Sequence, residues 1–232
     1  MDYLVERELN LLYILLDIGF LLFLGWMLLY FKKTKAFFFG VAGAIIYFVV
    51  DYGIFYLLLQ TREVTGANTF IFLLWLSTSY GFTNFVWIWL FLDKEKRIWE
   101  WSLLIVIAWF SIGLISQSFG SGFPVIQISR GTGSYHGYMA IILFVGYAIV
   151  IIKNLNQKSE QIPILKLLFI GIIVQFSWES ALLISGIRPL DWNPLIINSL
   201  LETNLGLPYL YFIHKAIISQ KKSNNDLVLE TD

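Results

Sequence analysis

Residues 9–31 of the chain read LNLLYILLDIGFLLFLGWMLLYF, a run in which Asp17 is the only charged side chain. A helix needs roughly 20 apolar residues to cross the hydrocarbon core of a bilayer. Further runs of this kind lie at 37–60, 69–92, 100–118, 135–152, 164–186 and 194–217. The sequence therefore predicts an all-α, polytopic membrane protein with seven transmembrane helices.

The composition agrees with residence in a membrane. Hydrophobic residues make up 58% of the chain and charged residues 14%, whereas roughly a quarter of a soluble domain is charged. These runs are longer than the roughly 10-residue strands of a membrane β-barrel, so helices are expected. The formal net charge is zero, which argues against nucleic-acid binding, and the chain has no cysteine for disulfides or thiol chemistry.

The basic residues predict the orientation in the membrane. All lysines and Arg97 lie in, or at the adjoining ends of, the segments that follow the first, third, fifth and seventh runs, whereas the opposite side carries only four arginines. Because Lys and Arg accumulate in cytoplasmic loops, we expect the N-terminus outside and the C-terminus in the cytoplasm of a multi-pass cell-membrane protein. Residues 1–218 form one transmembrane domain, and 219–232 form a polar tail that is expected to be disordered. The outer arginines are Arg7, Arg62, Arg130 and Arg188, and we expect Arg130 and Arg188 to be solvated or to attract an anionic head group.

Two pairs of segments suggest an internal repeat. Residues 46–51 (IYFVVD) align with 174–179 (VQFSWE), and 76–81 (LSTSYG) align with 201–206 (LETNLG). Three helices, a linking helix and three more helices would then form a parallel 3+1+3 repeat. The alternative is a chance similarity between apolar, leucine-rich segments.

Four carboxylates lie inside the predicted spans. An ionisable side chain within a membrane is costly and by default marks a functional site. Each acid lies roughly seven to nine residues from the outer end of its helix, which places them in one layer about 10–14 Å below the outer surface. We therefore expect these acids to share a cavity, although polar groups that only hold helices together remain the alternative. The four are Asp17, Asp51, Glu179 and Glu202.

The helical neighbours of these acids are amides and aromatic side chains. In a low dielectric some carboxyls are expected to stay protonated and to act as proton donors, while an ionised partner accepts a proton. Aromatic faces stabilise a cation. This chemistry suits proton-initiated cyclisation or isomerisation of a lipid-like substrate, and equally suits proton-coupled transport or binding of a cationic ligand. The candidate substrate-binding residues are Tyr47, Asn84, Gln175, Trp178, Asn198 and Tyr209, together with Asp17 and Glu179.

Several other kinds of site are excluded by the residue types present. His136 and His214 are the only histidines, and they lie at opposite ends of their spans, so a zinc site has too few ligands at one level. The last run has no lysine at mid-span that could hold retinal. We therefore expect neither a metal nor a cofactor.

Two segments carry a resemblance to a known family. Residues 25–60, with Asp51, and residues 199–215 (SLLETNLGLPYLYFIHK), with Glu202, resemble the acid-bearing helices 2 and 7 of the seven-helix, integral-membrane terpene cyclases of fungal meroterpenoid and indole-diterpene pathways. That family has a Trp-Glu pair in helix 2, which is here found instead at Trp178-Glu179. The resemblance implies a metal-independent cyclase, an isomerase or lyase in which Asp51 and Glu202 are catalytic and an isoprenoid is the substrate.

Three functions thus stay open. The first is an enzyme acting on an isoprenoid or other apolar, lipid-like small molecule. The second is a small-solute transporter of the parallel-repeat type, and the third is a receptor or assembly module without chemistry. In each case the partners that we expect besides a ligand are membrane lipids.

Overall fold

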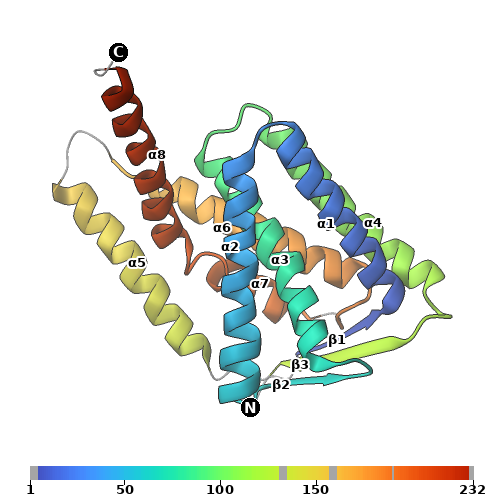
Figure 1. Cartoon of the computed structure of the whole chain (residues 1–232). Coiled ribbons are helices and arrows are strands. Elements are labelled where there is room, and N and C mark those ends of the chain that lie inside the picture. Colours follow the sequence, from blue (N-terminus) through green and yellow to red (C-terminus); the bar gives the residue numbers. More distant parts are fainter. Residues whose placement is uncertain (1–4, 131–134, 157–160, 190, 230–232) are drawn as a thin grey trace.

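The computed structural model describes residues 5–130, 135–156, 161–189 and 191–229. Long helices dominate it (Figure 1), and six of them, counting α2 and the π-helix η1 as one, are long and apolar enough to span a membrane. This confirms a helical, multi-pass membrane protein. The helices are α1 (Leu11–Tyr30), α2 (Thr34–Phe48), the π-helix η1 (Val49–Leu58), α3 (Thr69–Leu92), α4 (Ile98–Phe119), α5 (His136–Asn156), α6 (Ile164–Ile184), α7 (Trp192–Leu201) and α8 (Leu207–Leu229).

The surface of the helices explains why they need a membrane. Large apolar side chains point outward along them, and Leu22, Phe144 and Leu165 are 72%, 72% and 82% exposed. Contiguous apolar surface of this extent is rare on soluble monomers. In a bilayer the same side chains lie against lipid tails.

The seventh apolar run is not one helix. It divides into α7 and α8, and residues 202–206 between them form turns. Neither piece meets the length and hydropathy of a membrane span by itself within the described residues. α8 then continues through Leu229, so the expectation of disorder is wrong for residues 219–229.

A three-stranded antiparallel sheet lies at one end of the bundle, and no feature of the sequence analysis predicted it. Its strands are β1 (Val5–Asn10), β3 (Val125–Arg130) and β2 (Arg62–Thr65), in that order. They come from the N-terminus and from the segments between α2 and α3 and between α4 and α5. A backbone hydrogen bond of 3.0 Å from Glu8 N to Ile187 O adds the segment after α6. We call this assembly the cap sheet; it brings together all the segments expected outside the membrane (Figure 1).

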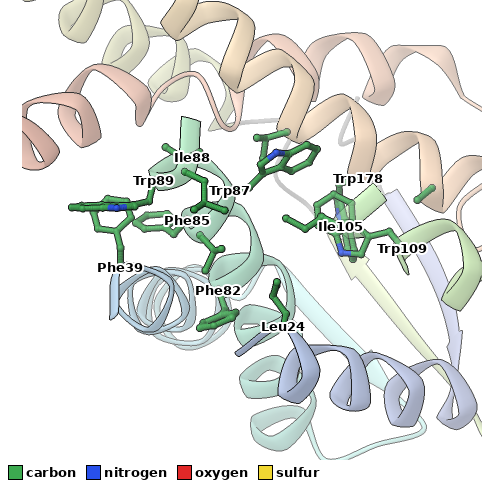
Figure 2. Close-up of a cluster of buried hydrophobic side chains, with 14 of the residues drawn as sticks. Leu24, Phe39, Phe82, Phe85, Trp87, Ile88, Trp89, Ile105, Trp109 and Trp178 are labelled. Atoms are coloured by element: carbon green, nitrogen blue, oxygen red, sulfur yellow. The ribbon is translucent and has the colours of Figure 1, made fainter. Parts of the chain in front are cut away.

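The helix α3 is the centre of the fold. Its side chains are buried almost continuously from Gly81 to Phe91. Figure 2 shows aromatic rings of α3 packed between Phe39 of α2 on one side and Trp109 and Trp178 of α4 and α6 on the other. α2 and α3 approach closely because Gly43 and Gly81 face each other, which lets the two backbones come together.

Asn10 connects the cap sheet to the bundle. It is the last residue of β1 and the N-cap of α1, where its side chain accepts a hydrogen bond of 3.0 Å from Tyr13 N. Its amide also donates to Ser116 O of α4 at 2.9 Å. The change from strand to helix is therefore anchored by one buried side chain.

Candidate functional site

A cavity of about 300 Å³ lies among α2, η1, α3, α5, α6, α8 and the turns between α7 and α8. This volume is at the small end of the roughly 300–1,000 Å³ of ligand pockets. Most of its wall is apolar or aromatic. Six of the ten residues predicted from the sequence line it: Tyr47, Asp51, Gln175, Trp178, Glu202 and Tyr209.

Asp51 lies in the π-helix η1. Such a helix closes i→i+5 hydrogen bonds, as seen where Leu59 N donates to Ile54 O at 2.9 Å, and it is often found at functional sites. The Asp51 carboxylate forms a salt bridge with Arg62 of β2 and accepts a hydrogen bond from the Tyr80 hydroxyl of α3. Asp51 and Arg62 are 3% and 5% exposed, so this pair is buried.

Glu202 lies in the irregular segment between α7 and α8. Its carboxylate accepts a hydrogen bond of 2.9 Å from the Gln175 amide. The Thr203 hydroxyl donates to the other end of the same amide at 2.7 Å, which orients Gln175. Irregular backbone within a membrane protein is tolerated where it lines a cavity, as it does here.

Glu179 is fully buried behind this cavity rather than on its wall. Its carboxylate forms ion pairs with Arg188 at 2.5 Å and with Arg7 at 3.7 Å. The amides of Gln175 and Asn198 donate to it at 3.3 Å each. Glu179 therefore connects β1 and the segment after α6 to the bundle. Neither Glu179 nor Asn198 lines the cavity.

Two further predicted residues lie elsewhere. Asp17 of α1 accepts a hydrogen bond of 3.0 Å from Trp75 Nε1, and α1 contributes no residue to the cavity wall. Asn84 is 1% exposed within α3 and is also absent from the wall. The shared depth that the sequence predicts for the acids carries no information about which way each helix face points.

A chain of aromatic rings runs from the cavity into the core. Tyr47 and Tyr80 meet edge to face with their centroids 4.7 Å apart, and Tyr80 stacks on Trp178 at 6.2 Å. Trp178 then contacts Trp109 at 5.1 Å. Their π faces can stabilise a positive charge that develops in the cavity.

The arginines were not recognised as site residues from the sequence. Arg188 is 3% exposed and pairs with Glu179, so the expectation that it is solvated is wrong. Arg7 is also 3% exposed and lines the cavity. The available signal was the choice of basic residue, because Arg rather than Lys is preferred in buried ion pairs and the outer segments contain only Arg.

The strand alternation places these arginines. In β2, Arg62 is buried and Glu63 is exposed; in β1, Arg7 and Leu9 are buried while Glu8 is exposed. Successive side chains of a strand point to opposite faces, so one face of the cap sheet carries Arg7 and Arg62 toward Glu179 and Asp51.

Comparison with known proteins gave no match: no family model, curated protein or solved structure is detectably similar to the chain. The site must therefore be interpreted from its own geometry.

Proposed function

We propose that the protein is an integral-membrane, terpene cyclase-like enzyme that carries out proton-initiated cyclisation or isomerisation of an isoprenoid or similar lipid-like substrate. The observation that carries this proposal is the placement of Asp51 and Glu202 on one aromatic-walled, largely apolar cavity. An acid, a base and π faces in a site of low dielectric are the groups that a carbocation reaction needs.

The hydrogen bonds support different roles for the two carboxylates. Asp51 receives donors from Arg62 and Tyr80, which favour the carboxylate form, so we assign it the role of the base. Glu202 is left as the proton donor. Its place in a non-helical segment allows its side chain to approach the substrate without moving a helix.

The reaction balances without a cofactor. For a terminal epoxide, Glu202 gives its proton to the oxygen as the bond from oxygen to the more substituted carbon breaks. The neighbouring double bond supplies the electron pair for a new carbon–carbon bond. The final cation loses a proton to Asp51, and this proton returns to Glu202 before the next turnover. Substrate and product are isomers.

The position of the cavity supports a substrate that arrives from the bilayer. Ile46 lines the cavity and is 50% exposed on the lipid-facing surface of α2. Arg7, Asp51 and Glu202 provide a polar part of the wall, whereas Phe85, Ile88 and Leu210 provide apolar parts. An amphiphile with an oxygenated end and a hydrocarbon chain matches this division.

The proposal includes seven membrane spans, the cap sheet outside the cell membrane, and the 3+1+3 parallel repeat. The pattern of ion pairs supports the repeat. Asp51 pairs with Arg62, and Glu179, its predicted counterpart, pairs with Arg188. In each case the arginine comes from the segment that directly follows the helix of the acid.

The test uses the purified protein in lipid nanodiscs with the terminal epoxide of farnesol as substrate and mass-spectrometric detection of cyclic isomers. Asp51→Asn and Glu202→Gln should each lower turnover by at least about 100-fold, since general acid–base groups contribute about 10²–10⁴-fold. Glu100→Gln, an exposed acid on the opposite side, is the matched control and should leave turnover unchanged. Full activity in both amide variants would contradict the assignment.

A binding measurement tests the same site without turnover. Farnesyldimethylamine, protonated at neutral pH, imitates the cation that the proposed reaction forms. We expect it to bind the protein by calorimetry and expect Asp51→Asn to weaken this binding by at least about 10-fold, because one charge–charge interaction is lost in a poorly solvated site. Equal binding to both proteins would show that Asp51 does not stabilise a cation.

The helix break favours one second candidate. Discontinuous membrane helices form the binding sites of many secondary transporters, and Glu202 lies in such a break. Proton-coupled uptake of a polar solute into proteoliposomes that Glu202→Gln abolishes, together with no isomerisation of the epoxide, would replace the enzyme by a transporter.

A further inference from the structure

A second cavity, of about 310 Å³, lies at the end of the bundle away from the cap sheet. It is formed where α1 leads into α2 and where α3 ends, with α8 alongside (Figure 1). We call it the lysine pocket. Its wall consists of Lys32, Lys33, Thr34, Lys35, Ala36, Trp89, Leu90, Asp93 and Ile218.

The lysine pocket carries an excess of positive charge. Lys33 pairs with Glu95, and Asp93 lies 3.5 Å from His214. Lys32 and Lys35 form no ion pair with any residue that the structure describes. Glu95 offsets the charge of Lys33, whereas the histidine beside Asp93 is charged only if it is protonated. With a neutral histidine, the three lysines exceed the two acids by one positive charge, which is available to a ligand.

Two more lysines, Lys94 and Lys166, lie near residues of this region. Lys166, near the start of α6, lies close enough to interact electrostatically with Lys94 and with His214. Lys35 also interacts with His214. Lys35 and Lys166 thus both act on His214, whose ring contacts Trp89 of the pocket wall, whereas lysines that only set membrane orientation need no common target.

The floor of the lysine pocket is apolar. Trp89 and Leu90 of α3 are buried, at 2% and 1% exposure, and the ring of Trp89 contacts His214 with centroids 4.6 Å apart. Ile218 on α8 is 38% exposed at its edge. A ligand that fits both parts has an anionic group for the lysines and a less polar portion against the tryptophan.

We propose that the lysine pocket binds a phosphate ester, and that its source is the head group of an anionic phospholipid. The lysine pocket lies at the ends of the apolar helices, where such head groups are found. Basic pockets between helices on the cytoplasmic side, where we expect this one, are typical lipid head-group sites. The proposal is independent of the reaction assigned to the other cavity.

The backbone at Lys32 offers a clean way to remove a charge. Its φ is 57°, in the left-handed region that favours glycine. Lys32→Gly therefore removes the ammonium group and fits the local conformation. Combined with Lys35→Gln, it removes two charges from the pocket. The matched control, Lys96→Gln with Lys153→Gln, removes two lysine charges from the same end of the bundle that do not line the pocket.

The experiment measures lipid binding to the detergent-purified, full-length protein by native mass spectrometry, with phosphatidylglycerol and phosphatidylcholine as probes. A second arm uses soluble glycerol 3-phosphate and calorimetry. We expect phosphatidylglycerol to bind more tightly than phosphatidylcholine and the pocket variant to weaken its binding by about 10-fold or more, because each basic residue near a membrane surface contributes to anionic-lipid binding. The control should change binding less than about 2-fold.

Each outcome decides the proposal. Binding of the phospholipid that depends on Lys32 and Lys35 supports it as stated. If only glycerol 3-phosphate binds in this way, the phosphate site stands and its source is a soluble metabolite, so the lipid is rejected. If the pocket variant and the control behave alike with both probes, while melting curves show both to be folded, the phosphate site is rejected.

Discussion

At Asp51, a guanidinium from the cap sheet and a phenol from α3 bind one carboxylate. Removing two charges from water is costly, and their attraction repays this cost only when geometry and hydrogen bonds are good. A buried pair of this kind is therefore poor evidence for stability, but losing one partner is damaging. The pair fixes how β2 sits on η1, and so it fixes the direction in which Asp51 points.

This asymmetry predicts the behaviour of Arg62 variants. Arg62→Met should destabilise the protein by about 3–5 kcal/mol, since it leaves the Asp51 carboxylate buried without its cation. Arg62→Met combined with Asp51→Asn should recover much of the loss, because the amide is neutral and can still accept from Tyr80. Thermal unfolding in a fixed detergent measures both. A double variant that is less stable than Arg62→Met would contradict this account of the pair.

Glu95 lies in the connection between α3 and α4 and gives a prediction for pH. Partial burial raises its pKa, but the hydrogen bond and charge of Lys33, with the backbone N–H and charge of Arg97, outweigh burial and leave the pKa below its usual value of 4.5. A carboxyl with a lowered pKa stabilises the fold above its unfolded-state pKa. This stabilisation is lost as the pH falls through the folded-state pKa.

Glu95→Gln should therefore lower the melting temperature at neutral pH, by an amount that corresponds to no more than about 1 kcal/mol for a pair near the surface. The difference from the unchanged protein should shrink below about pH 4.5, where the carboxyl becomes protonated in the unfolded state. Glu63→Gln, at an exposed position of β2, is the control. A difference that grows in acid would show that the Lys33–Glu95 pair does not account for it.

At the scale of elements, the length of an apolar run predicted most of the helices, whereas irregular backbone within a run was not predicted. The predicted run 69–92 coincides with α3 (Thr69–Leu92), because crossing lipid requires an uninterrupted apolar helix. Hydropathy gives no sign of the π-helix η1, since an added i→i+5 turn leaves composition unchanged. It also hides the break at 202–206, whose backbone is satisfied by turns and protein contacts. The acids Asp51 and Glu202 were predicted as site residues, but their irregular local backbone was not.

The close packing of α2 on α3 can be tested at Gly43. A Cβ atom there would collide with the Phe85 ring and with the backbone oxygen of Gly81, and backbone cannot yield as a flexible side chain can. Gly43→Val should destabilise the protein by at least about 1–3 kcal/mol, the usual cost of overpacking. Gly19→Ala is the control, because a Cβ atom at Gly19 meets nothing within 4 Å. Thermal melts of the two variants that coincide would contradict this close contact.

For the whole molecule, the cap sheet supplies buried cations that pair with two of the acids, Arg62 with Asp51 and Arg7 with Glu179. Buried charges need partners, and the only lysines or arginines within the apolar runs are Lys166 and Lys215, each close to the predicted inner end of its run. The partners come from segments far apart in the sequence, and the strands that carry them are four to six residues long. Strands this short have little periodicity, so the sequence alone did not predict them. The depth of the acids in the membrane, which is inferred from helix length alone, stays a prediction.

The separation of Arg from Lys across the molecule predicts its orientation. None of the segments that form the cap sheet contains a lysine. Because cytoplasmic loops are enriched in Lys and Arg, the cap sheet should face the outside. The chain has no cysteine, and single cysteines can therefore report this directly. Ser121→Cys, exposed beside β3, should react with a membrane-impermeant maleimide in intact cells, whereas Lys96→Cys, exposed between α3 and α4, should react only after permeabilisation. The reverse labelling would invert the topology and place the lysine pocket against the outer leaflet. Equal labelling of both cysteines in intact cells would mean that these two connections do not lie on opposite sides of a membrane.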